Sequence, residues 1–182
     1  MSDEQQILRD IQRRLSNLIR KGRIQSVDFT QTPPRVRVEY ATNATTTWLP
    51  WIGGRASSQS RTDWEPLSVG EQCLIFSESG ELSAGVVLPA MLDSQSPPPS
   101  TSADEHVTKY ADGTVIMYSR ATHELSVTVN GGDINIKTTA NVNVNATNIK
   151  LNNGANVVTT AHICQFTGNA HEDGSSTVFA GE

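Results

Sequence analysis

Three residues near the C-terminus carry side chains that could bind a metal ion. His162 and Cys164 lie two positions apart in the segment Ala161–Phe166, and alternate residues of a β-strand project to the same face. If three copies ran in parallel around one axis, three imidazoles and three thiols would meet there. Thiolates favour softer metals such as zinc over octahedral iron. We therefore take His162, Cys164 and the more distant His171 as candidate metal ligands; the alternative is a packing layer without metal.

The segment Asp133–Ala146 has the pattern that would position such a site. Apolar and polar side chains alternate in it over fourteen residues, which is typical of a strand with one dry and one solvated face. A single strand cannot bury its own dry face, so its partner must lie elsewhere in the chain or in other copies. The dry face holds only small or β-branched residues, namely Ile134, Ile136, Thr138, Ala140, Val142, Val144 and Ala146.

The composition favours solvated strands over a helical bundle. Only 36% of the 182 residues are hydrophobic and 18% are charged, and Thr, Ser, Asn and Gly make up much of the remainder. The formal net charge is −5. Because contacts to phosphate require a basic surface, we expect no nucleic-acid readout.

The sequence also bears on the compartment of the protein. It contains no apolar run of about eighteen residues that could form a transmembrane helix. Its N-terminus has no apolar core of the kind that a signal peptide needs, so we do not expect secretion by that route. The two cysteines, Cys73 and Cys164, lie in different kinds of segment. We interpret them as free thiols of a reducing compartment.

The first half of the chain predicts a helix followed by a small barrel. Residues 1–20 form an amphipathic pattern, and we expect this helix to pack on the next domain or its symmetry mates, or to dock a larger partner. Residues 21–92 contain about five short strand patterns separated by turn signals, which fits an OB-type barrel. The apolar positions of the helix are Ile7, Ile11, Leu15 and Leu18.

The second half predicts a linker and a β-rich tail. Residues 93–105 include Pro97–Pro99 and read as an extended linker. Residues 106–182 contain short strands in series with almost no large side chains, and we expect these strands to lack partners within the chain. We therefore expect their partners to be the same strands in other copies of the chain.

Several side chains have ordinary structural interpretations. We expect Trp48, Trp51 and Trp64 to serve barrel core and loop packing, and Cys73 to be an inert core thiol. His106 and His123 lie in polar contexts, and we expect both at the surface.

At this point the sequence resembles a known family. The segments Trp48–Trp51 (W-L-P-W) and Val69–Gln72 (V-G-E-Q) are fairly specific in combination. With them, in order, come Trp64-x-Pro66, Gly80-Glu81-Leu82, Gly85-Val86-Val87 and, after the Pro-rich linker, Asp112-Gly113-Thr114. Together they resemble phage baseplate assembly protein V, the central spike of contractile tails, which also occurs in R-type pyocins.

The resemblance implies a fold and a role. The expected fold is all-β: a short helix, an N-terminal OB barrel, then an intertwined triple-stranded β-helix spike with its apex at the C-terminus. The expected assembly is a homotrimer at the tail tip of a virion or pyocin, assembled in the host cytoplasm. Its N-terminal domain would dock to tail tube and baseplate hub proteins. Sheath contraction would then drive it through the host outer membrane.

The resemblance also bears on the metal. Family members commonly hold iron at the apex with a His-x-His pair from each chain, whereas this chain has His162-x-Cys164. The departure leaves open whether one ion per trimer binds and whether it is iron or zinc.

Two other functions compete with the spike. We expect no catalysis, because neither G-x-S-x-G nor H-E-x-x-H occurs and no carboxylate pair clusters in the sequence. A trimeric receptor-binding tail fibre or adhesin tip is the alternative. Such a tip should end in exposed aromatic residues for glycan contact, but the C-terminal region has only Phe166 and Phe179.

Overall fold

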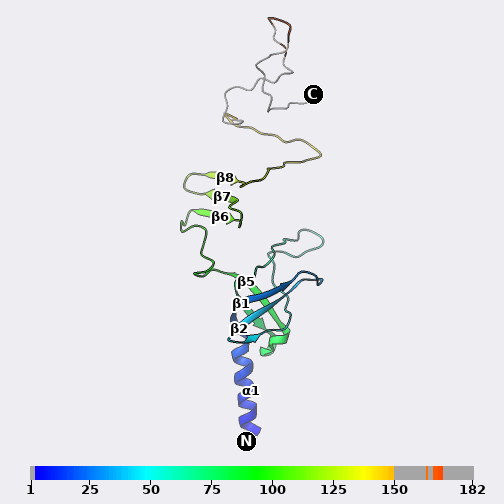
Figure 1. Ribbon diagram of the computed structural model, residues 1–182, viewed down its shortest axis with the longest axis vertical. Coiled ribbons are helices and arrows are strands. Elements are labelled where there is room, and N and C mark those ends of the chain that lie inside the picture. The colour runs from blue at the N-terminus through cyan, green and yellow to red at the C-terminus, as the bar shows by residue number, and fades with distance from the viewer. Residues whose placement is uncertain (1–2, 150–162, 164–165, 170–182) are drawn as a thin grey trace. The chain divides into compact units, whose positions relative to one another are not determined.

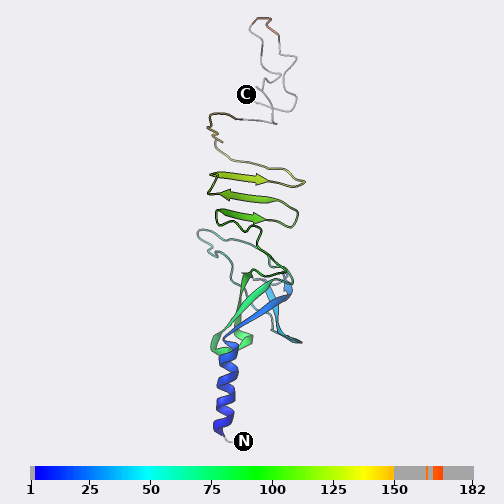
Figure 2. The same ribbon diagram turned by 90° about the vertical axis from the view of Figure 1, so that its left-hand side faces the viewer.

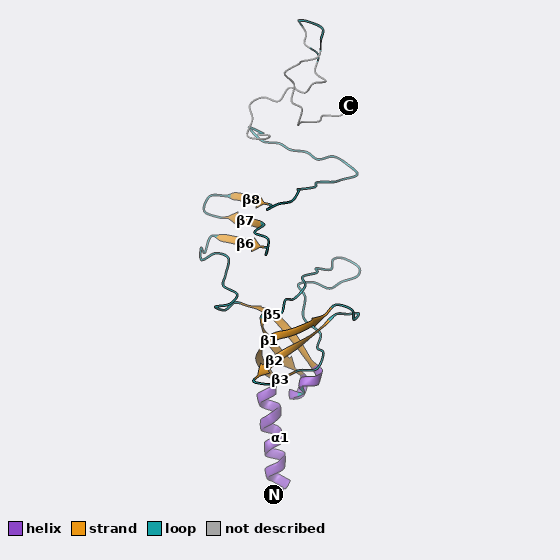
Figure 3. Cartoon of the chain, viewed as in Figure 1, coloured by secondary structure: helices purple, strands orange, loops and turns teal. Residues whose placement is uncertain are grey.

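The computed structural model describes residues 3–149, 163 and 166–169. The chain divides into two compact units, Met1–Gly132 and Asp133–Glu182. The described part is mostly β, with one helix at the start and two single 3-10 turns in the barrel (Figure 3).

The first element is helix α1, Asp3–Asn17 (Figure 1). Asp3 and Glu4 lie in its first turn and Arg14 in its last, which suits the helix dipole. Asp10 forms ion pairs with both Arg13 and Arg14, one turn further along. The predicted helix is therefore confirmed, although it ends three residues before the expected limit because the chain turns into the first strand.

Five antiparallel strands follow the helix and form one sheet. They are β1 (Ile19–Asp28), β2 (Arg35–Ala41), β3 (Ala44–Thr45), β4 (Gln72–Ser77) and β5 (Gly85–Met91). Their spatial order is β3-β2-β1-β4-β5. The edge strands of this order are β5 and the two-residue strand β3, which pairs only with the end of β2 and leaves the start of β2 open.

The segment after β3 closes this sheet into a barrel. Leu49 pairs with Val36 of β2, and Trp51 forms a parallel bridge to Val87 of β5. Backbone hydrogen bonds support both joins: Val36 N–H donates to Leu49 O at 2.9 Å, and Val87 N–H donates to Pro50 O at 2.9 Å. Closure satisfies backbone groups that an edge would expose, and it confirms the predicted OB-type domain.

The barrel core is aliphatic. In β2, Val36 and Val38 are fully buried while Arg37 and Glu39, which follow them in turn, are exposed, the alternation expected of a strand with one dry face. Burying each such side chain contributes about 1.5–3 kcal/mol relative to exposure. The core consists of Ile24, Val36, Val38, Leu49, Leu67, Cys73, Ile75 and Val87.

The tryptophans correct one prediction. None of them belongs to the buried core, and Trp64 is 60% exposed. Trp51 is partly buried and packs against the core. The guanidinium carbon of Arg37 lies over the ring of Trp48, 4.7 Å from the ring centre. Their expected role in loop packing is confirmed, since Trp64 contacts Trp51 and Phe29. The eight residues of the buried core are all smaller than tryptophan.

A second sheet follows irregular backbone after β5. It contains β6 (Glu105–Lys109), β7 (Val115–Ser119) and β8 (Glu124–Thr128), paired antiparallel in chain order (Figure 2). The expectation that strands after the linker lack partners within the chain is wrong here. The reason is turn geometry: Gly113 (φ 90°) and His123 (φ 56°) adopt the left-handed conformation that tight turns use.

The alternating segment Asp133–Ala146 carries no strand assignment in the single chain, and its side chains are exposed. A strand is defined by backbone pairing, and the pairing expected of this segment is with other copies of the chain. The triple-stranded β-helix therefore remains a prediction.

Candidate functional site

The predicted metal ligands His162, Cys164 and His171 all lie outside the described residues, so the metal site stays a prediction. Over residues 3–149, 163 and 166–169, no three His, Cys, Asp or Glu side chains gather as a metal site would require. His106 and His123 are exposed, as expected.

Cys73 is a free thiol in the barrel core, with none of its surface exposed. Its Sγ lies 3.6 Å from the carbonyl oxygen of Gly22. Burial, with a smaller effect of Glu71, raises the pKa of Cys73 to about 11. Since the thiolate is the reactive form, Cys73 is chemically quiet, and its predicted place in the core is confirmed.

One face of the second sheet presents apolar side chains to solvent. Ile116 pairs with Val127 and Tyr118 pairs with Leu125 across the β7–β8 ladder. Directly opposite residues of two strands project from the same face of a sheet, so these four side chains form one patch. All four are more than a third exposed, and Leu125 reaches 69%.

His106 and Thr108 of β6 extend this patch. His106 lies opposite Tyr118, and Thr108 lies opposite Ile116, in the β6–β7 register. The patch on β7 is thus flanked by residues of β6 on one side and of β8 on the other. We call the six residues the sheet face: His106, Thr108, Ile116, Tyr118, Leu125 and Val127. An apolar face of this kind marks an interaction surface when it is contiguous.

An ion pair ties the barrel to the segment that leaves it. Arg23 of β1 donates hydrogen bonds to the carbonyl oxygen of Gly70 at 2.8 Å and to the carboxylate of Asp93. The backbone N–H groups of Ser96 and Gln95 donate to the same carboxylate. The Ser96 N–H, then Arg23 and Gln95, hold the pKa of Asp93 below its ordinary value.

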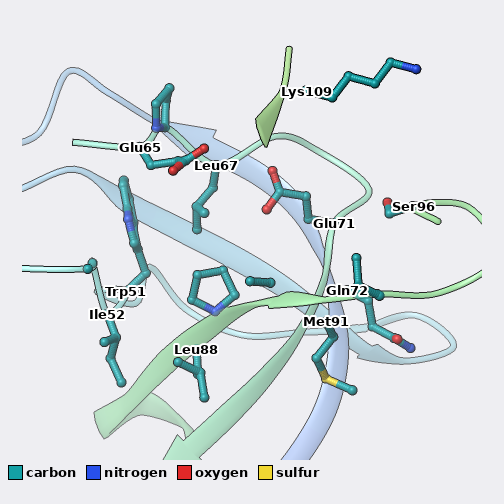
Figure 4. A pocket seen from close by; sticks show the side chains of 16 residues that line it. Trp51, Ile52, Glu65, Leu67, Glu71, Gln72, Leu88, Met91, Ser96 and Lys109 are labelled. Atoms are coloured by element: carbon teal, nitrogen blue, oxygen red, sulfur yellow. The ribbon is translucent and has the colours of Figure 1, made fainter. Parts of the chain in front are cut away.

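A pocket of about 660 Å³ lies beside β5. Trp51, Leu67, Leu88 and Met91 supply an apolar lining, and the close-up shows them around the same hollow (Figure 4). Polar side chains at its rim are Glu65, Glu71, Gln72, Ser96 and Lys109. The lining holds neither histidine nor cysteine.

Comparison with known proteins places the barrel in a family. The model of the Type VI secretion system/phage-baseplate injector OB domain matches residues 20–92. We refer to the barrel of residues 20–92 as the injector OB domain, after the family model that it matches. The match covers the barrel from β1 to β5, and it confirms the resemblance to the baseplate spike family seen in the sequence.

A relative extends the match beyond the injector OB domain. The chain is 41% identical over 120 residues to the "Spike protein" of Escherichia phage P2, which covers 66% of this chain and 54% of that protein. The chain therefore spans about half the length of this relative.

Among the described residues, no helix is both long and apolar enough to cross a membrane.

The quoted motifs have structural reasons within the injector OB domain. In V-G-E-Q, Gly70 has a φ of 96°, and the carboxylate of Glu71 accepts a hydrogen bond from Ser68 N–H at 2.6 Å. Glu71 O also accepts from Ile24 N–H at 2.9 Å. The motif thus forms the turn that immediately precedes β4. In W-L-P-W, Leu49 and Trp51 make the two bridges that close the barrel.

The sheet face was missed at the level of sequence. The alternation Ile116, Tyr118 in Val115–Ser119 and Leu125, Val127 in Glu124–Thr128 was its available signal. Only the antiparallel register shows that the two pairs share one face.

Proposed function

We propose that this chain is the structural central spike of a contractile tail, of a phage or of an R-type pyocin. The observation that carries the proposal is an injector OB domain followed by a sheet whose apolar face is exposed in the single chain. The sequence match to a phage spike protein over 120 residues supports the same role.

The sheet face supports a homotrimer. Exposed Leu125 and Val127 would leave water when three copies bring these faces together, and burial of apolar surface drives such association. The alternating segment Asp133–Ala146 would continue the shaft as an intertwined triple-stranded β-helix. Its small residues suit a narrow axis where three chains meet.

The barrel suits mechanical attachment. Its closure by Leu49 and Trp51 leaves few free backbone groups at its edges. In the proposed assembly the N-terminal domain docks to tail tube and baseplate hub proteins, at the tail tip of the particle. Sheath contraction then drives the opposite, C-terminal end through the host outer membrane.

The apex is the part of the proposal that involves a metal. His162, Cys164 and His171 would supply imidazole and thiolate ligands from each copy, to an ion of iron or zinc. Such an ion would hold three chain ends together. No catalytic step belongs to this function.

The experiment is gold labelling of tail particles with an antibody against the injector OB domain, before and after sheath contraction. The spike predicts one labelled position at the distal end of the tail axis. A receptor-binding fibre or adhesin tip predicts label at the periphery of the baseplate, and that result would overturn the proposal.

A further inference from the structure

Helix α1 exposes a stripe of large apolar side chains that its own barrel does not cover. Ile7, Leu8, Ile11 and Leu15 each expose more than half of their surface. The helix contacts the barrel through other residues. A guanidinium nitrogen of Arg13 lies 3.7 Å from a carboxylate oxygen of Glu81. The stripe is therefore a free surface of the single described chain.

The spacing of the stripe is that of a coiled-coil seam. Leu8, Ile11 and Leu15 are separated by three and then four residues, which places them at the a, d and a positions of a heptad. Leu18 continues the spacing one residue past the end of α1 and is 39% exposed. Glu4 would occupy the preceding d position, so the seam begins at Leu8.

The residue types at the seam favour more than two helices. Leu at a with Ile at d shifts parallel coiled coils toward trimers and tetramers. Ile7, at the g position beside Leu8, widens the apolar stripe. A wider stripe is covered better by two neighbouring helices than by one.

The charges of α1 are compatible with parallel copies of itself. The e and g positions along the seam are Gln5, Ile7, Gln12 and Arg14. Only Arg14 is charged, and Asp10 of the same helix binds it at 2.8 Å. Like charges therefore do not face each other between neighbouring parallel helices, and repulsion does not oppose association.

We propose that the α1 helices of three copies pack together as a short parallel coiled coil through Leu8, Ile11 and Leu15. This inference rests on the proposed homotrimer and adds the surface that joins its N-terminal ends. A helix of 15 residues is marginal by itself in water, so the coil forms only in chains that the rest of the trimer already holds together.

The test is site-directed cross-linking of the full chain in a Cys164→Ser background, where the remaining Cys73 is buried. One variant carries Leu8→Cys on the seam. Its control carries Gln6→Cys, an exposed position on the outer side of the same helix. Both are treated with a short bismaleimide, and the molar mass of each untreated sample is measured first.

The coiled coil predicts trimeric mass for both variants and covalent dimers as the main product of the Leu8→Cys chain alone. Trimeric mass with no more cross-linking in Leu8→Cys than in Gln6→Cys overturns the coiled coil and leaves the proposed spike standing. Monomeric mass for both variants and for the unmodified chain, which retains Cys164, overturns the two together.

Discussion

Gly80 lies directly against the backbone of Arg14, at the joint between the barrel and α1. A β-carbon built on Gly80 would overlap the carbonyl oxygen of Arg14. Gly80 also has a φ of 71°, a conformation that favours glycine. The joint therefore depends on the absence of a side chain at this position.

Gly80→Ala should weaken that joint. The left-handed conformation costs an alanine roughly 1–2 kcal/mol, and the overlap with Arg14 adds to this cost, so we expect a loss of unfolding free energy of about 2 kcal/mol or more. Urea unfolding of the full chain measures it. Gly70→Ala is the control, since Gly70 has a φ of 96° but no atom within 4 Å of the added carbon. Equal losses in both variants would show that the contact with Arg14 has no energetic role.

The Arg23–Asp93 pair should make stability depend on pH in the acid range. The folded-state pKa of Asp93 lies below its ordinary value of 3.8. The stabilisation is therefore complete above about pH 4 and is lost as the pH falls through the folded-state pKa. We expect Asp93→Asn to reduce the drop in unfolding free energy between pH 5 and pH 3, measured by urea unfolding. An unchanged drop in the variant would contradict the assigned role of Asp93.

Cys73 should resist thiol reagents until the barrel unfolds. With a pKa of about 11, its thiolate fraction at pH 8 is about 0.1%, against roughly a quarter for a free cysteine. In a Cys164→Ser background we expect labelling by a disulfide reagent to be at least about a hundredfold slower in the folded protein than in urea. Similar rates in the two states would mean that Cys73 is accessible.

The sheet face should control assembly. Leu125→Asp places a charge on the most exposed of the four apolar residues of that face. Burying an unpaired charge is costly, so we expect the trimer to dissociate. Thr128→Asp is the matched control, because Thr128 pairs with Val115 and lies on the opposite face of the sheet. Molar mass by light scattering is the measurement. Retention of the trimer by Leu125→Asp would remove this face from the interface.

Local patterns predicted much of the barrel. Arg35–Ala41 alternates cleanly between apolar and polar residues, which predicts a strand paired antiparallel with the one before it, and the structure confirms that pairing. The helix was equally readable from its apolar spacing. The parallel bridge between Trp51 and Val87 could not be predicted from local patterns, because it joins segments far apart in the chain and depends on tertiary packing.

The tail was harder to predict for a different reason. The hairpin before β8 depends on His123 in a left-handed conformation, and a non-glycine residue gives little warning of it. The preceding turn at Asp112–Thr114, by contrast, contains an Asp-Gly pair, which is a strong turn signal. The partners of Asp133–Ala146 are an assembly property, which the alternation of one chain does not determine.

The most direct test of the central claim is the molar mass of the unmodified full chain in solution, by size-exclusion chromatography with light scattering. A spike of three copies predicts three times the chain mass of 19.7 kDa, unchanged on dilution across the micromolar range. A mass equal to that of one chain would contradict the trimer, and with it the proposed spike.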